Sequence, residues 1–383
     1  MSVYLDFNSS APIDERVLDL MIEVYRNVIG NADSRTHEFG EKARKVVEDA
    51  RGQVASILGI NRDEIFFTSG ATESDNIAIQ GLKEFGISEN KRHIITTSIE
   101  HKAVLETVKA LQKQGFEVEF VNPDRSGRID ADDLLSKVRK DTLVVSVMHV
   151  NNETGIIQPI KEIGDNLSEK NVLFHIDATQ SLGKLVDELR ETKYTMLSMS
   201  AHKLGGPQGV GALILRKKRY KLPPVKSIMF GGQQEHGIRP GTLPVALIAG
   251  LGKACEIAEM EYQTYDNKCR LIKEKLIDML QKSGLEYEFN GDQRYAINST
   301  MNISIKGVDS EALMLSSKSY CSISNGSACN SKSYRPSYVL SAMGIPTKQI
   351  EQSIRISWGA GIGIKEAEEA FGKLLVTAQG LVW

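Results

Sequence analysis

The chain is poor in cysteine and tryptophan: its 383 residues include four cysteines and two tryptophans. Four cysteines without a C-x-x-C pair exclude a disulfide framework and give no zinc-binding pattern, so we predict no metal site. The chain also lacks an excess of one charge, because 47 Lys and Arg residues stand against 49 Asp and Glu residues. A protein whose main partner is nucleic acid usually carries a basic excess. We therefore expect no strong direct binding of nucleic acid, although a local basic patch remains compatible with this balance.

Long apolar runs and a leader segment are not seen either. The longest apolar runs, such as Leu143–Val150, are far shorter than the roughly 20 residues of a membrane-spanning helix. The N-terminal residues MSVYLDFNSSAP pass directly into an apolar alternation without a basic region, so no secretion signal is visible. With 41% hydrophobic and 25% charged residues, the composition is that of a globular protein. We expect a cytoplasmic enzyme of the α/β class that does not contact a membrane.

Short β-branched runs alternate with longer amphipathic stretches over the first 220 residues. The predicted strands are Ile65–Phe67, His93–Thr97, Val118–Val121, Leu143–Val150, Val172–Asp177, Met196–Ser200 and Val210–Leu215. The predicted helices between them include Glu73–Phe85, Lys102–Gln114 and Pro159–Glu169. An earlier one has on one face Ala43, Val46, Val47, Ala50, Val54, Ile57 and Leu58. Alternation of helices with nearly continuous apolar strands favours a mainly parallel sheet that is covered on both faces.

The pattern changes after about residue 220. The predicted segments there are a glycine-rich loop, a long polar helix, two strands and a closing helix, at Phe230–Thr242, Leu243–Ser283, Thr300–Ile305, Ser353–Trp358 and Ile364–Val376. We predict a large domain of residues 14–260 and a smaller α+β domain built from residues 1–13 and 261–383. The smaller domain carries a polar loop, about 322–337, with Cys329 near its middle.

Two motifs place reactive groups at strand ends. Lys203 follows an apolar strand and precedes a Gly-Gly-Pro turn, a setting that removes water, lowers the pKa of the amine and favours Schiff-base formation. Asp177 ends a predicted buried strand, where α/β proteins place their ligands, and a carboxylate there suits a pyridinium nitrogen. Each also has a simpler interpretation, since Lys203 can be a surface lysine and Asp177 can cap the next helix.

Two further motifs lie between strands and helices. In Thr68–Ser74 (TSGATES), glycine and small hydroxyl residues would let backbone N–H groups and Thr72 face a phosphate at a helix N-terminus. The same residues are consistent with a plain capping box of Thr72 and Asp75. His101 follows a strand and opens a helix, so it can lie over a bound ring or simply at the surface.

Taken together and in this order, the motifs are specific. The chain resembles the pyridoxal-phosphate (PLP) enzymes of fold type I, and among them the cysteine desulfurases of the nitrogenase and iron–sulfur-cluster type with a mobile Ser-Ala-Cys loop. The resemblance rests on Tyr4–Asp6 with Ala11-Pro12, Thr68–Asn76, Glu100–Val104, Met148–Gly155, His175–Ser181, His202–Pro207, Gly231–Glu235, Arg239–Thr242, Ser327–Cys329 and Ile354–Ser357. These motifs cover nearly the whole chain. The resemblance implies a large domain with a seven-stranded, mainly parallel sheet between helices and a smaller α+β domain.

The resemblance also implies a role for each matching residue. Lys203 would bind PLP as a Schiff base and later move protons, while His101 would stack on the ring and act as acid and base. The other cofactor-binding residues would be Asp177 at the pyridine nitrogen, Gln180 at the phenolic oxygen, and Ala71, Thr72, Ser200 and His202 at the phosphate. Thr242 would join the phosphate site from a neighbouring subunit, which implies a homodimer. The substrate carboxylate would bind Asn152 and Arg355, although Arg355 alone can also be an exposed strand residue.

Cys329 is the candidate nucleophile among the four cysteines. A free cysteine is more often a small buried hydrophobic residue, but the Gly, Ser and Asn neighbours of Cys329 offer no apolar packing. Lys318, Lys332 and Arg335 lie nearby in sequence and can lower the pKa of the thiol. Cys321 is the second candidate, whereas Cys255 and Cys269 fall in the long helix and are interpreted as structural.

The implied reaction removes sulfur from L-cysteine. The thiolate of Cys329 would attack the substrate sulfur, leaving a persulfide on the enzyme and releasing L-alanine, and the loop would then present the sulfur to an acceptor protein. The acceptor would belong to one of four pathways that stay open here: iron–sulfur cluster assembly, nitrogenase, thionucleoside synthesis or DNA phosphorothioation. Because the chain ends at Trp383, we expect it to lack the longer C-terminal tail of the housekeeping members. The alternatives are a selenocysteine lyase, a PLP aminotransferase, and a catalytically idle sulfur-trafficking or assembly subunit.

Overall fold

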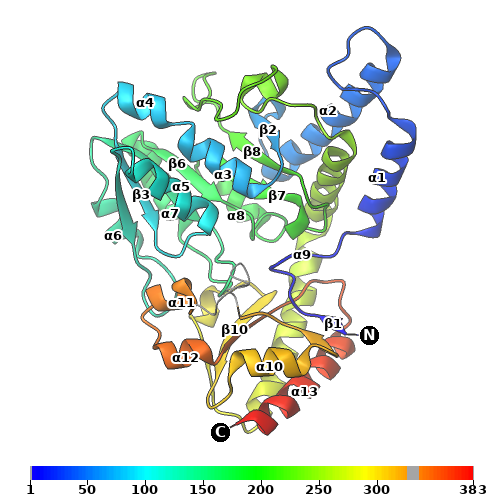
Figure 1. The fold of residues 1–383 in the computed structure, drawn as a ribbon, viewed down its shortest axis with the longest axis vertical. Coiled ribbons are helices and arrows are strands. Elements are labelled where there is room, and N and C mark those ends of the chain that lie inside the picture. The colour runs from blue at the N-terminus through cyan, green and yellow to red at the C-terminus, as the bar shows by residue number, and fades with distance from the viewer. Residues whose placement is uncertain (1, 326–335, 383) are drawn as a thin grey trace.

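The fold was analysed in a computed structural model, which describes residues 2–325 and 336–382. A seven-stranded sheet with the strand order β2-β8-β7-β6-β5-β3-β4 lies at the centre of the larger part of the molecule (Figure 1). Its strands are β2 (Ile65–Thr68), β3 (His93–Thr97), β4 (Glu117–Val121), β5 (Thr142–Met148), β6 (Leu173–Asp177), β7 (Met196–Ser200) and β8 (Gly211–Leu215). β8 runs antiparallel to both of its neighbours, β2 and β7, and the other four pairings in this order are parallel. The predicted α/β class with a mainly parallel sheet is confirmed.

Helices cover both faces of this sheet, and the side chains alternate between the two faces. One face packs against α2 (Glu38–Leu58), α7 (Ile160–Lys170), α8 (Val186–Glu191) and the first half of α9 (Val245–Lys282). The other face packs against α3 (Ala71–Gln80) and α5 (Lys102–Gln112). In β2, for example, Ile65 and Phe67 contact the first set of helices and Phe66 contacts the second. This alternation follows from the two-residue period of a strand, and it explains why the strands are apolar throughout.

A separate core holds the smaller part of the molecule together. It contains the antiparallel sheet β12-β10-β9, whose strands are Ser353–Ser357, Thr300–Ile305 and Tyr287–Phe289. It also contains the second half of α9, α10 (Ser310–Ser317) and α13 (Ile364–Leu381), and Figure 1 shows α9 running from one part into the other. The N-terminal strand β1 (Val3–Tyr4) pairs with β11 (Cys321–Ser322), so the two ends of the chain contribute to the same core. The predicted domain boundaries stay a prediction.

Five short or peripheral helices complete the chain: α1 (Glu15–Asn27), α4 (Lys83–Ser88), α6 (Ala131–Ser136), α11 (Tyr338–Ala342) and α12 (Thr347–Glu351). Two predicted helix bounds were wrong. The predicted helix Glu73–Phe85 is divided into α3 and α4 at Gly81, where a Cβ atom would lie 2.6 Å from the carbonyl oxygen of Lys226. The closing helix runs on to Leu381 because its apolar face continues through the buried Ala378. No helix in the described ranges is long and apolar enough to cross a bilayer.

Candidate active site

A cavity of about 540 Å³ lies at the carboxyl ends of β5, β6 and β7 and at the N-termini of α3 and α5. The carboxyl edge of a parallel sheet is where α/β folds bind their ligands. The predicted residues that line this one cavity are Ala71, Thr72, His101, Asn152, Asp177, Gln180, Ser200, His202, Lys203 and Arg355. Residues that are up to 284 positions apart in sequence therefore meet at a single site.

Lys203 ends a single 3₁₀ turn, Ala201–Lys203, that directly follows β7. Its Nζ donates hydrogen bonds to the carbonyl oxygens of Asn8 at 2.5 Å and Ser9 at 2.6 Å. Burial, aided by the positive charge of Arg355, lowers the pKa of Lys203 to about 8. A neutral amine is the form that attacks a carbonyl group, so this amine is closer to its reactive form at neutral pH than an exposed lysine.

Asp177 and His101 lie in the cavity near Lys203. Asp177 is the last residue of β6 and is buried, and its Oδ1 accepts a hydrogen bond from the backbone N–H of Thr179 at 2.9 Å. His101 is the N-cap of α5, where its Nδ1 accepts from the backbone N–H of Ala103 at 3.2 Å. Burial lowers the pKa of His101, so the ring is neutral at pH 7 and carries its proton on Nε2. His101 therefore both caps its helix and lines the cavity.

The N-terminus of α3 is open toward the cavity. Its N-cap is Gly70, which offers no side chain to cap the first N–H groups, so the alternative capping box of Thr72 and Asp75 is not formed. Gly211 lies against Gly70, and a Cβ atom at Gly211 would come within 2.7 Å of the Gly70 Cα. The uncapped N–H groups, with Thr72 and the buried Ser200, form a set of donors that suits a phosphate.

Arg355 on β12 reaches the cavity from the smaller part of the molecule. Its side chain is only 3% exposed, so the alternative of an exposed strand residue is wrong. Its Nη1 donates to the carbonyl oxygen of Asn152 at 2.9 Å, and its Nη2 donates to Asp6 Oδ1 at 2.6 Å and Ser9 Oγ at 2.8 Å. The guanidinium is therefore held in one orientation beside Asn152.

Several polar atoms that line the cavity have no partner in the described part of the chain. Asn152 Oδ1, Thr179 Oγ1, Gln180 Oε1 and Arg355 Nε are all buried, and none of them makes a hydrogen bond. Buried polar groups without partners are rare and costly, so such a cluster indicates that a ligand supplies the partners. A phosphate, a phenolic oxygen, a pyridine nitrogen and a carboxylate would match the groups present, so the residues fit PLP with an amino acid.

Thr242 does not line the described part of the cavity and is exposed, so its role at a neighbouring subunit stays a prediction. Cys329 falls in 326–335 and lies outside the described residues. The other three cysteines, Cys255, Cys269 and Cys321, are free and buried, and desolvation raises the pKa of each thiol, to about 12 for Cys269 and Cys321. These three thiols therefore stay protonated and unreactive at neutral pH.

Sequence reasoning missed the contribution of the N-terminal segment. Asn8 and Ser9 line the cavity, and the carbonyl oxygen of Asn8 accepts hydrogen bonds from both Lys203 and Gln180 Nε2, the latter at 2.9 Å. The polar run Asn8-Ser9-Ser10 after an apolar alternation is the feature of the sequence that could have indicated this role. A local pattern does not show, however, which distant strand the segment contacts.

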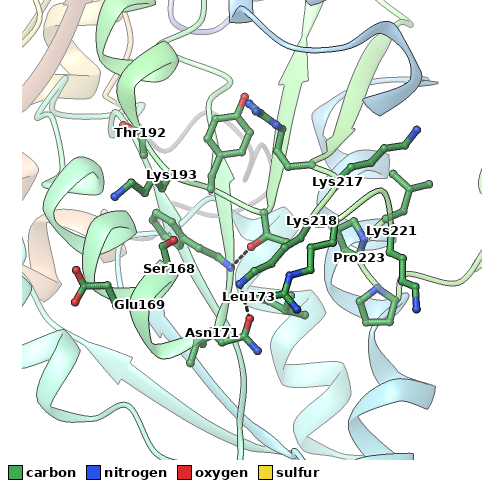
Figure 2. Close-up of a pocket in the computed structure, with 18 of the residues that line it drawn as sticks. Ser168, Glu169, Asn171, Leu173, Thr192, Lys193, Lys217, Lys218, Lys221 and Pro223 are labelled. Carbon is green, nitrogen blue, oxygen red and sulfur yellow. Dashed lines mark hydrogen bonds between the residues drawn. The ribbon is translucent and has the colours of Figure 1, made fainter.

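A second, larger cavity of about 980 Å³ lies at the opposite edge of the sheet, where β6 and β7 begin. Figure 2 shows Lys217, Lys218 and Lys221 on one side of it and Lys193 on the other. Several of its cations are already paired, for example Lys193 with Asp165 at 2.8 Å. None of the predicted site residues lines this cavity.

Comparison with known proteins agrees with the geometry of the first cavity. Residues 3–368 match the model of the family described as Aminotransferase class-V. The chain is 44% identical over 363 residues to cysteine desulfurase IscS of Pasteurella multocida (strain Pm70), covering 94% of this chain and 88% of that protein.

Two solved structures are also similar to this chain. A NifS-like protein superposes with a TM-score of 0.91 at 35% identity and full coverage of both chains. DndA from Streptomyces lividans superposes with a TM-score of 0.81 at 42% identity, covering 93% of this chain and 99% of that chain. With matches of this extent, the chain belongs to the class-V aminotransferase family of PLP-dependent enzymes, and within it is a cysteine desulfurase of the NifS/IscS type.

Proposed function

We propose that the residues of the 540 Å³ cavity divide the work of desulfuration as follows. Lys203 would hold PLP, Asp177 would face its pyridine nitrogen, and Gln180 would face its phenolic oxygen. Ala71, Thr72, Ser200 and His202 would hold the phosphate at the open N-terminus of α3. Bound PLP acts as an electron sink that makes the bonds next to the substrate's α-carbon labile. The cluster of buried, unpartnered polar atoms around the cavity is the observation that carries this assignment.

The substrate would be oriented by Arg355 and Asn152. Arg355 offers the substrate carboxylate a planar cation with an unused Nε–H. The unused Oδ1 of Asn152, which also lines the cavity, is an acceptor and would take a hydrogen bond from a donor on the bound molecule. His101 and Lys203 are the groups placed to move protons. Burial lowers the pKa of each group, so the His101 ring is neutral at pH 7 and Lys203, with a pKa of about 8, gives up its proton more readily than an exposed lysine. Each can therefore accept a proton and return it.

Cys329 would take the sulfur from L-cysteine as a persulfide, with release of L-alanine, and pass it to an acceptor protein. Residues on the two flanks of the segment that carries Cys329 contact Arg355, which lines the cavity, and Glu153, which adjoins the lining residue Asn152. Ser324 pairs through its backbone with Arg355, and Ser337 Oγ donates to the buried Glu153 beside Asn152 at 2.5 Å. Cys329 is four residues from Asn325, so their Cα atoms are at most roughly 14 Å apart. The three described thiols, by contrast, are buried and protonated.

We also propose that the enzyme is a cytoplasmic homodimer in which Thr242 serves the partner's phosphate site. The loop that carries Thr242 presents Phe230 with 96% of its surface exposed, next to the exposed Met229. The same loop is tied to the cavity edge, because Arg239 Nε donates to Glu73 Oε1 at 3.0 Å. An exposed aromatic residue on a fixed loop suits burial against a second copy of the chain.

The deciding experiment uses the variants Cys329→Ser and Cys321→Ser in parallel. After incubation with L-cysteine, mass spectrometry should detect a persulfide on the wild type and on Cys321→Ser but not on Cys329→Ser. All three proteins should show the same PLP absorbance. Sulfur transfer at the wild-type rate by Cys329→Ser would contradict the assignment of Cys329 as the residue that takes the sulfur. A purified protein without PLP absorbance would instead favour an idle assembly subunit.

A further inference from the structure

Asp6 lies beside Arg355 because the backbones of their segments are paired. Ser357 N donates to Leu5 O at 2.9 Å and Phe7 N donates to Ser357 O at 3.3 Å, which places Asp6 opposite Ser357. Arg355 is two residues earlier on β12, so it points to the same face of the strand as Ser357. The contact between the two side chains is therefore fixed by strand pairing.

The ion pair between Asp6 and Arg355 is largely shielded from water. Asp6 Oδ1 and Arg355 Nη2 are 2.6 Å apart, and the two side chains are 16% and 3% exposed. A charge-assisted hydrogen bond in such a setting is much stronger than one at the surface. Asp6 therefore neutralises the cation that we assign to the substrate carboxylate.

The hydrogen-bond pattern of Arg355 leaves no free two-donor edge. A guanidinium has five N–H donors, and each of its two-donor edges includes an Nη2 hydrogen. Both Nη2 hydrogens are engaged, one by Asp6 and one by Ser9 Oγ. One hydrogen of Nη1 is engaged by the carbonyl oxygen of Asn152. A carboxylate that binds both prongs of Arg355 must take the place of Asp6 or Ser9 at Nη2.

We propose that Asp6 is a specificity-determining residue that keeps free carboxylates out of the active site. A carboxylate on a molecule without an amino group meets an ion pair that has no net charge and must displace the Asp6 anion from Arg355. Its binding free energy is therefore small. The carboxylate of an amino acid is different, because its amino group is engaged by the cofactor and its effective concentration at Arg355 is high. Asp6 would thus reject cysteine analogues that lack the amino group, and this inference rests on the proposed role of Arg355.

The probe for this inference is 3-mercaptopropionate, which is cysteine without its amino group. Its binding to the holoenzyme is measured by calorimetry, with propionate as a probe that also lacks the thiol. The variant Asp6→Asn keeps an oxygen that accepts from Nη2 but removes the negative charge. We expect roughly tenfold tighter binding of both probes to this variant than to the wild type.

The matched control is Asp14→Asn, because Asp14 also pairs with an arginine, Arg16 at 2.8 Å, but caps α1 away from this cavity. It should bind both probes as the wild type does. If Asp6→Asn does not fold, Asp6→Ser keeps an accepting oxygen without charge and takes its place.

Unchanged affinity of the Asp6 variant for both probes would overturn the inference. A separate variant, Arg355→Gln, tests the role on which the inference rests. It should raise the KM for cysteine by at least about tenfold, because the cation that binds the carboxylate is gone. A wild-type KM in that variant would show that the assignment of Arg355 has failed, whatever Asp6 does.

Discussion

Glu100 is a buried acid directly before His101, and it makes the stability of this enzyme depend on pH. Its Oε1 accepts hydrogen bonds from Thr97 Oγ1 at 2.6 Å and from Met148 N at 2.9 Å, while its Oε2 is buried without a partner in the described chain. Burial raises the pKa of Glu100 from 4.5 to about 8. The folded protein therefore keeps this proton at a pH where the unfolded chain has lost it.

The sign of the effect follows from proton binding. Between pH 4.5 and about 8 the folded state holds more protons at Glu100 than the unfolded state does, so the free energy of unfolding falls as the pH rises. Each pKa unit is worth 1.36 kcal/mol, so the loss amounts to at most about 5 kcal/mol across this range. The variant Glu100→Gln keeps an oxygen that accepts from Thr97 and Met148 but has no proton to lose. It should gain stability relative to the wild type as the pH rises toward 8, and the difference should level off above that pH.

The measurement is urea unfolding of both proteins between pH 5 and 9, followed by circular dichroism at a fixed PLP concentration. The control is Glu117→Gln, which removes an exposed carboxylate whose pKa is lowered by hydrogen bonds from Arg139. That carboxylate is ionised across the whole range in both states, so its removal should not change the slope with pH. Parallel curves for the wild type and Glu100→Gln would refute the reasoning, because Glu100 would then be ionised in the folded protein.

Three further predictions follow from the fold and the cavity. Asp177→Ala should weaken PLP binding at least about tenfold, measured by absorbance after dialysis, because the carboxylate beside the ring is gone; full retention of PLP would contradict this role. Phe230→Asp should convert the proposed dimer to monomers in sedimentation, since it places a charge in the proposed interface; a variant that sediments as a dimer would show that Phe230 is not part of the interface. Ser337→Ala should lower the free energy of unfolding by about 1–2 kcal/mol in urea titrations, because Ser337 caps α11 and donates to Glu153. Stability equal to the wild type would show that this contact is not formed in solution.

The sequence was sufficient for features that depend on local patterns. The apolar runs that predict His93–Thr97, Met196–Ser200 and Thr300–Ile305 match the bounds of β3, β7 and β10 because both faces of these strands are buried. Asp177 could be placed at the end of β6 because it is the first carboxylate after an apolar run, and a strand that is buried on both faces ends at such a residue. The position of a group at a strand end then indicates the ligand-binding edge of a parallel sheet.

Features that depend on distant contacts could not be predicted. The division between α3 and α4 depends on how closely the segment near Lys226 approaches Gly81. The spacing of apolar residues within a helix carries no information about such a contact with a distant segment. The place of Asn8 and Ser9 in the cavity depends on the pairing of the N-terminal segment with β12, about 350 residues later in the chain. The same pairing brings Asp6 to Arg355, although the two residues lie in separate motifs near opposite ends of the sequence.

The N-terminal segment links the two ends of the active site physically. Its carbonyl groups at Asn8 and Ser9 hold the amine of Lys203, while the Asp6 side chain and the Ser9 hydroxyl hold the guanidinium of Arg355. The two cations belong to parts of the molecule with separate cores. They lie close enough to each other for the charge of Arg355 to lower the pKa of Lys203. Asp6 opposes that effect, since its charge raises the pKa of Lys203. Removing the charge of Asp6 should therefore make Lys203 more acidic as well as freeing Arg355. One residue of this segment would thus adjust both the amine that we assign to the cofactor and the cation that we assign to the substrate carboxylate.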